Sequence, residues 1–123
     1  MNPTTLVVED HPINRRLLRD LLEWRGHDVV EAVGVDDAWD ALVARAPDLV
    51  LLDIQIPGGG GDHLLTRMRA DPRMMGLPVV AVTAQSMPGD RERLLARGFD
   101  AYVSKPIDTR AFIQLVDGLV GRS

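Results

Sequence analysis

The 123-residue sequence contains no cysteine, which excludes disulfides, thiolate metal sites and a thiol nucleophile. It has no apolar run near the roughly 20 residues that a membrane-spanning helix needs. Its first five residues lack the basic region and apolar stretch of a signal peptide. Repeats, low-complexity tracts and linkers are also missing. These absences favour a cytoplasmic protein with no membrane partner.

The chain also lacks an excess of basic residues. It carries 14 Lys and Arg against 18 Asp and Glu, for a formal net charge of -4. This balance argues against non-specific nucleic-acid binding, which needs a basic surface, although it leaves a local basic patch open. The length fits one domain over residues 1–123, and 46% apolar and 26% charged residues are ordinary for a globular protein.

Short apolar segments alternate with helical patterns along the whole chain, which is typical of βαβ units. Strands are predicted at 6–8, 28–32, 49–52, 79–82 and 101–103, and helices at 12–25, 35–46, 62–70, 88–97 and 108–120. Crossovers between parallel strands are nearly always right-handed. The predicted fold is therefore an α/β, flavodoxin-like (βα)5 doubly wound sandwich, with a five-stranded parallel sheet in the order 2-1-3-4-5.

The first predicted helix carries apolar residues at every fourth position, Ile13, Leu17 and Leu21, with Leu18 and Leu22 beside them. This stripe predicts the buried face of the helix. Two tryptophans, at positions 24 and 39, are interpreted as packed or half-exposed aromatics rather than ligand stackers. All three histidines, at positions 11, 27 and 63, are expected at the surface.

Polar side chains follow four of the predicted strands directly: Glu9-Asp10, Asp53, Thr83 and Lys105. The carboxyl ends of the strands in an open parallel sheet line the crevice where ligands bind. Three carboxylates in one crevice need a proton or a cation to balance their charge. Mg²⁺ suits oxygen ligands and bridges carboxylates to phosphate. The pattern predicts a divalent-metal site that handles phosphate.

Plainer interpretations of these residues stay open at this point. Glu9 and Asp10 fit a solvated turn in which Asp10 caps the next helix, and Asp53 fits a turn. Asp53 also fits either a metal ligand alone or a nucleophile that forms an aspartyl-phosphate. Thr83 fits an ordinary strand residue, and Lys105 an exposed loop.

Four segments and their spacing resemble the receiver domain of bacterial response regulators, the CheY-like family of two-component signalling, over nearly the whole chain. They are Leu6-Val7-Val8-Glu9-Asp10, Leu51-Leu52-Asp53-Ile54-Gln55-Ile56-Pro57, Ala81-Val82-Thr83-Ala84 and Ser104-Lys105-Pro106. The resemblance implies that Asp53 accepts a phosphoryl group from a histidine of a histidine kinase or histidine phosphotransfer protein. Mg²⁺, or Mn²⁺ in its place, would be held by Glu9, Asp10, Asp53 and the backbone carbonyl of Gln55.

The resemblance further implies that Thr83 and Lys105 bind phosphoryl oxygens, that the small Ala84 leaves the phosphate accessible, and that Lys105-Pro106 is a cis peptide. It also implies a switch in which Thr83 moves toward the phosphate and Tyr102 swings inward. That change would remodel the face formed by the fourth helix, fifth strand and fifth helix, where a downstream protein would bind. We expect a monomer, with dimerisation on phosphorylation as an alternative.

The chain departs from the family in the run Gly58-Gly59-Gly60-Gly61, where Met-Asp-Gly is common at the last three positions. Four consecutive glycines raise the entropic cost of ordering a loop, so we expect an unusually mobile connection after the third strand. Arginines at positions 15, 16 and 19 make the outer part of the first helix basic. This helix borders the crevice and is a candidate surface for the phosphodonor.

The leading interpretation is a stand-alone receiver, because the chain ends soon after the fifth helix. By the resemblance, it would not be a substrate-turnover enzyme. One alternative is a receiver excised from a hybrid histidine kinase or larger regulator. Another is a Mg²⁺-dependent phosphatase with an aspartyl nucleophile, although Gln55 stands where that chemistry usually has a second Asp. A flavodoxin-type cofactor binder is disfavoured, because Glu9 and Asp10 would repel a bare phosphate.

Overall fold

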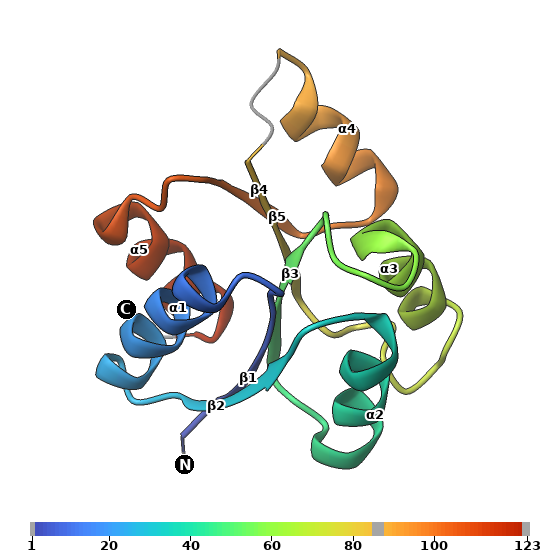
Figure 1. Ribbon diagram of the computed structural model, residues 1–123, viewed down its shortest axis with the longest axis horizontal. Helices are drawn as coiled ribbons and strands as arrows, with labels where there is room; N and C mark the ends of the chain where they lie inside the picture. The colour runs from blue at the N-terminus through green and yellow to red at the C-terminus, as the bar shows by residue number, and fades with distance from the viewer. Residues whose placement is uncertain (1, 85–87, 122–123) are drawn as a thin grey trace.

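The structure is a computed structural model that describes residues 2–84 and 88–121 (Figure 1). Five strands and five helices alternate along these two described ranges. Their bounds are β1 Thr4–Val8, α1 Pro12–Trp24, β2 Asp28–Ala32, α2 Val35–Arg45, β3 Leu49–Asp53, α3 Gly60–Arg69, β4 Val79–Thr83, α4 Asp90–Arg97, β5 Ala101–Ser104 and α5 Thr109–Leu119. Most predicted ends agree to within one residue; β1 and α3 begin two residues earlier than predicted and α4 begins two residues later.

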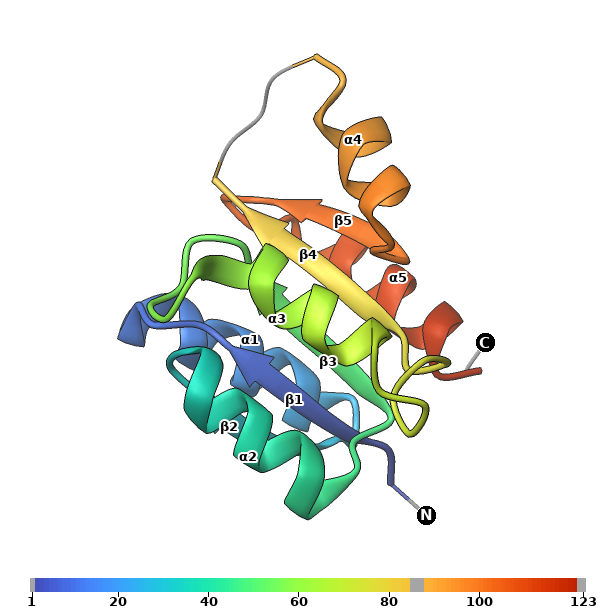
Figure 2. The ribbon, with the colours of Figure 1, turned by 90° about the vertical axis from the view of Figure 1, so that its right-hand side faces the viewer.

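All strand pairs are parallel, in the order β2-β1-β3-β4-β5, which confirms the predicted doubly wound topology. Helices α1 and α5 cover one face of the sheet, and α2, α3 and α4 lie on the other (Figures 1 and 2). Each face has its own apolar core, with Leu18, Leu22 and Phe112 on the first and Leu42, Leu64 and Met68 on the second. Every residue of β3 is buried, as expected for a central strand covered on both faces.

The buried face of α1 differs from the prediction. Leu18 and Leu22 are buried, whereas Ile13 is 73% exposed and Leu17 is 39% exposed. The four-residue spacing is real, but α1 is rotated so that it packs on the sheet through the neighbouring pair of leucines. An apolar stripe of this kind fixes the helical period and leaves open which edge of the stripe faces inward.

Two further expectations about single residues are wrong. His27 is buried, and its Nδ1 lies 2.7 Å from the hydroxyl of Thr5, so a hydroxyl near the start of β1 holds it inside. Trp24 is 74% exposed at the end of α1, with the Arg25 guanidinium 5.7 Å from its ring centroid. Trp39 is half-buried, as predicted, under the Arg67 guanidinium.

Only the first half of the glycine run lies in the loop that precedes α3. Gly58, Gly59 and Gly60 have positive φ angles, but α3 begins at Gly60, and Gly61 is buried in its first turn. A Cβ on Gly61 would lie 2.9 Å from both the carbonyl oxygen of Asp53 and the Cα of Ile54. Close approach of α3 to the end of β3 therefore requires glycine here. The mobility expected for this connection stays a prediction.

Within residues 2–84 and 88–121, no helix is long and apolar enough to cross a membrane. The Lys105-Pro106 peptide is cis, as the resemblance implied.

Substituting alanine for Gly61 is predicted to destabilise the fold by about 1–3 kcal/mol, because the added methyl meets backbone that cannot move aside. Urea denaturation measures this change. Gly118→Ala is the matched control: it lies inside α5, where an added Cβ would meet no heavy atom of another element within 4 Å, and it should be neutral or stabilising by up to about 1 kcal/mol. Equal stability of the two variants would contradict this account of the turn.

Candidate functional site

The polar residues singled out from the sequence converge at the carboxyl edge of the sheet. Glu9 and Asp10 follow β1, Asp53 ends β3, Thr83 ends β4, and Lys105 follows β5. β1 and β3 are neighbours, and the register pairs Val8 with Leu52, so the residues that follow on both strands leave the sheet at the same level. The parallel sheet itself therefore assembles the site.

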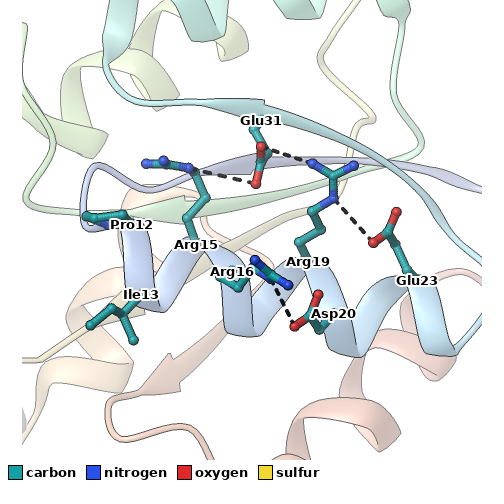
Figure 3. Close-up of a pocket in the computed structure, with 8 residues that line it drawn as sticks. All are labelled: Pro12, Ile13, Arg15, Arg16, Arg19, Asp20, Glu23 and Glu31. Carbon is teal, nitrogen blue, oxygen red and sulfur yellow. Dashed lines mark hydrogen bonds and ion pairs between the residues drawn. The ribbon is translucent and has the colours of Figure 1, made fainter.

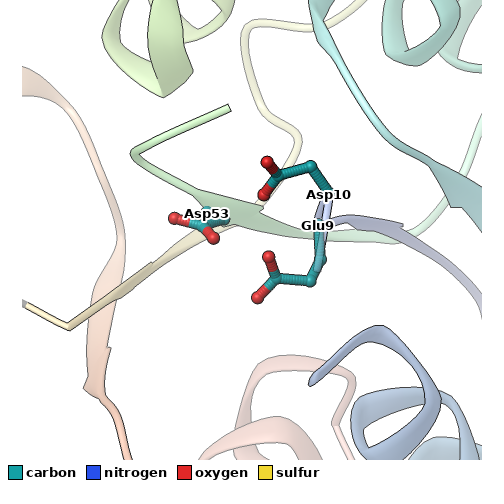
Figure 4. Close-up of side chains that lie close together, drawn as sticks. All are labelled: Glu9, Asp10 and Asp53. Carbon is teal, nitrogen blue, oxygen red and sulfur yellow. The ribbon is translucent and has the colours of Figure 1, made fainter. Parts of the chain in front are cut away.

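Three carboxylates form the centre of this site. Single oxygen atoms of Glu9, Asp10 and Asp53 lie within 4.8 Å of one another. Figure 4 shows the three side chains close together at the ends of two strands. Glu9 is 1% exposed and Asp53 5% exposed, while Asp10 lies at the surface. A cation that reached the cluster would meet two buried oxygen donors and one open to solvent.

The Lys105 ammonium connects the two buried carboxylates. Its Nζ lies 2.6 Å from Oε1 of Glu9 and donates to Oδ2 of Asp53 at 2.9 Å. The other oxygens accept backbone hydrogen bonds: Asp53 Oδ1 from the N–H of Gln55 at 2.9 Å, and Glu9 Oε2 from the N–H of His11 at 3.2 Å. Lys105 therefore holds one oxygen of each buried carboxylate, and a backbone N–H holds the other.

Burial raises the pKa of Glu9 to about 7, and the adjacent Asp53 carboxylate adds to this shift. Burial also acts to raise the pKa of Asp53, but hydrogen bonds from Glu9, from the Gln55 N–H and from Lys105 outweigh it and hold that pKa below its ordinary value. Desolvation acts to lower the pKa of Lys105, and its two carboxylate partners outweigh that effect and raise it. The favoured state is an ionised Asp53 and a charged Lys105, with Glu9 ready to exchange its proton near neutrality.

Thr83 is buried beside this cluster. Its carbonyl accepts from the N–H of Lys105 at 2.9 Å, and its register partner on β5 is Ser104. Ala84, the next residue, is exposed. Tyr102 is half-buried on β5 and packs against the core on the α2 and α3 side of the sheet. Thr83 thus lies at the site, whereas Tyr102 lies two residues before the end of β5.

Gln55 is exposed, and its N–H rather than its carbonyl contacts Asp53. The carbonyl's role as a metal ligand stays a prediction.

Sequence reasoning missed one residue, Arg15. The sequence places it on the basic outer face of α1, but its side chain is 23% exposed, and its Nη1 donates to the carbonyl of Glu9 at 3.1 Å. Its position in the first turn after an acidic pair is the only signal in the sequence, and that signal is weak.

The donor set fits a hard divalent cation. It contains only oxygen ligands, and three carboxylates face one ammonium, so ionised carboxylates leave an excess of negative charge. Mg²⁺ prefers such donors and retains waters, which the exposed Asp10 permits.

The pKa of Glu9 predicts a pH dependence for the metal-free protein. Between its ordinary value of 4.5 and about 7, folded Glu9 holds a proton that unfolded Glu9 has lost. Its contribution to stability is therefore complete below pH 4.5 and is lost as the pH rises through 7.

Between pH 5 and pH 8, we expect the free energy of unfolding of wild type to fall by about 1–3 kcal/mol relative to that of Glu9→Gln. Urea denaturation in EDTA measures both. The difference between the two proteins cancels the groups that titrate independently of Glu9. A difference that does not change with pH would show that Glu9 titrates normally.

Comparison with known proteins agrees with this geometry. Residues 5–117 match the family described as the response regulator receiver domain. The polar-differentiation response regulator DivK of Brucella ovis is 36% identical over 121 residues, which cover 98% of each chain.

Two solved structures share the fold at similar levels. The receiver domain of sensor histidine kinase PA1611 from Pseudomonas aeruginosa, solved with magnesium in its active-site cleft, has a TM-score of 0.88 and 26% identity, and covers 98% of this chain and 99% of its own. A LuxR-family two-component response regulator from Aurantimonas has a TM-score of 0.86 and 28% identity, and covers 99% of this chain and 88% of its own. This chain therefore belongs to the response regulator receiver domain family.

Proposed function

We propose that this receiver accepts a phosphoryl group on Asp53 from a phosphohistidine of a histidine kinase or histidine phosphotransfer protein. A carboxylate oxygen of Asp53 forms the new bond to phosphorus, the bond between phosphorus and the histidine nitrogen breaks, and the imidazole leaves with that electron pair. The observation that carries the proposal is the Asp53 carboxylate, 2.9 Å from the Lys105 ammonium and grouped with two further carboxylates.

Residues around Asp53 supply the charge and access that the transfer needs. The Lys105 ammonium exchanges its carboxylate partner for a phosphoryl oxygen, and the Thr83 hydroxyl donates to another. The side chain of Ala84, small and exposed, leaves room for the incoming group. Water later hydrolyses the acyl phosphate, so the protein resets its own state and turns over no separate substrate.

Mg²⁺ would be held by Glu9, Asp10, Asp53 and the backbone carbonyl of Gln55, with Mn²⁺ able to replace it. When bound, the cation supplies positive charge that offsets the phosphoryl oxygens. The structure of PA1611 with magnesium in its cleft supports this assignment, as do the three grouped carboxylates of this chain.

The output is a protein contact. Phosphorylation adds a dianion that draws Thr83 and Lys105 toward it, and Tyr102 moves inward on the neighbouring strand. The surface of α4, β5 and α5 changes with Tyr102 and binds a downstream protein. The match to the Brucella ovis DivK, over 98% of each chain, supports a role as a response regulator for this receiver. The phosphatase alternative is disfavoured because position 55 carries the amide of Gln55 rather than the second carboxyl group that this chemistry usually has.

Incubation with Mg²⁺ and acetyl phosphate is predicted to add one phosphoryl group to the wild-type chain, and none to Asp53→Asn, because the amide is a poor nucleophile. Intact mass spectrometry measures the gain. Asp36→Asn, which changes an exposed carboxylate on α2, should be phosphorylated as wild type is.

A phosphohistidine protein serves as a second donor in parallel with acetyl phosphate. A wild type that gains nothing from either donor, or an Asp53→Asn variant that gains as much as wild type, would contradict the proposal.

Removing the exposed carboxylate of the cluster is predicted to weaken Mg²⁺ binding. Asp10→Asn should lower the affinity about tenfold or more, equivalent to about 1.4 kcal/mol, because a charged ligand becomes a neutral one. Isothermal titration calorimetry at pH 8 measures the change, again with Asp36→Asn as the control. Equal affinities for the two variants would place the cation elsewhere.

A further inference from the structure

We infer that Arg15 is a positioning residue for the acidic pair Glu9–Asp10, and that Glu31 holds Arg15 in place. The inference rests on the proposed function, because the acidic pair matters there as a cation ligand set. It concerns side chains outside the site itself, on α1 and on the edge strand β2.

Arg15 contacts the backbone of the acidic pair rather than its carboxylates. Its Nη1 donates to the carbonyl of Glu9 at 3.1 Å and lies 3.5 Å from the carbonyl of Asp10. The two carbonyls fix the planes of successive peptide groups, and these planes set the direction in which both side chains leave the backbone. Arg15 therefore controls where the carboxylates point without lying among them.

Among the described residues, the start of α1 has few other contacts that hold it to the residues before it. His11 is the N-cap residue, but its side chain makes no capping hydrogen bond, and Pro12 at the first helical position offers no N–H. The backbone of the loop contacts the helix through the N–H of Arg15, which donates to the carbonyl of His11 at 2.9 Å. The side chain of Arg15 adds a second connection, from the first turn of α1 back to the residues that precede the helix.

Glu31 on β2 orients Arg15 from the other side. Figure 3 shows the Glu31 carboxylate between Arg15 and Arg19 at the groove lined by α1 and Glu31, with the outer end of the Arg15 guanidinium pointing away from Glu31. The Nε of Arg15 lies 3.8 Å from Oε1 of Glu31, and Nη1 of Arg19 donates to Oε2 at 3.2 Å. Arg19 is held in turn by Glu23 at 3.2 Å. Glu31 therefore contacts Arg15 at Nε, and Nη1 of Arg15 faces the backbone of Glu9 and Asp10.

The two roles open to Arg15, a nearby positive charge or a positioning residue, predict opposite changes in Mg²⁺ affinity when Arg15 is removed. If Arg15 acted only as a nearby cation, its removal would make the acidic site more negative and tighten Mg²⁺ binding. If Arg15 positions the loop, its removal weakens binding, and loss of a partner outside the ligand shell lowers metal affinity by about 10–100-fold. The sign of the change therefore separates the two roles.

The test compares Arg15→Met, Arg15→Lys, Glu31→Gln and the control Arg16→Met in the full chain. Arg16 is next in sequence, 79% exposed, and paired with Asp20 on its own helix, so Arg16→Met removes the same charge without touching the loop. Titration calorimetry with Mg²⁺ should show affinity about tenfold weaker for Arg15→Met, with Glu31→Gln and Arg15→Lys between it and wild type, and Arg16→Met unchanged or slightly tighter. Tighter binding by Arg15→Met overturns the inference.

Amide hydrogen exchange of His11 in EDTA gives a second result that needs no metal. This N–H donates to Glu9 Oε2, so a loosened loop should speed its exchange about threefold or more in Arg15→Met and leave it unchanged in Arg16→Met. Unchanged exchange in Arg15→Met overturns the inference. A wild type that binds no Mg²⁺ defeats the proposed function, while the exchange rates still decide the role of Arg15.

Discussion

The site depends on one electrostatic balance, the contact of the Lys105 ammonium with the buried carboxylates of Glu9 and Asp53. Two carboxylates this close and this deeply buried cannot both remain charged without a partner. One lysine serves both, so the ionised form of Asp53 persists while Glu9 holds its proton to a higher pH. The same contact therefore keeps ionised the carboxylate on which the proposed phosphorylation depends.

This balance would also let the site respond to the ligands proposed for it. A cation held by the three carboxylates would take over the neutralising role and leave Lys105 available to a phosphoryl oxygen. The change in partner is local, but Lys105 follows β5 directly, and its N–H bonds to the carbonyl of Thr83 at the end of β4. Both strands that carry the proposed switch are therefore connected to the residue that changes partner.

The fold could be predicted from the sequence because its signals are local. The apolar segments and the Gly and Pro residues between them predicted all ten elements and the strand order, and the positions of Asp53, Thr83 and Lys105 at strand ends followed from topology. A parallel sheet brings the ends of its strands to one edge whatever the side chains are. Convergence of the site therefore required no knowledge of packing.

What the sequence could not predict depends on contacts between distant segments. The rotation of α1, which exposes Ile13 and Leu17, is set by the packing of Leu18 and Leu22 on the sheet. His27 is buried by a hydroxyl 22 positions away. The glycine run enters α3 because Gly61 meets the end of β3, and Arg15 turns from the outer face to the loop because Glu31 lies on β2. None of these pairings leaves a periodic trace in the chain.

The most direct test of the central balance is a crystal structure of the protein grown with Mg²⁺ and beryllofluoride, a phosphoryl analogue. We expect beryllofluoride on the carboxylate of Asp53, a cation among Glu9, Asp10 and Asp53, and the Lys105 ammonium turned from Glu9 to a fluorine. Beryllofluoride bound elsewhere, or a Lys105 that keeps both carboxylate contacts with the analogue in place, would contradict it.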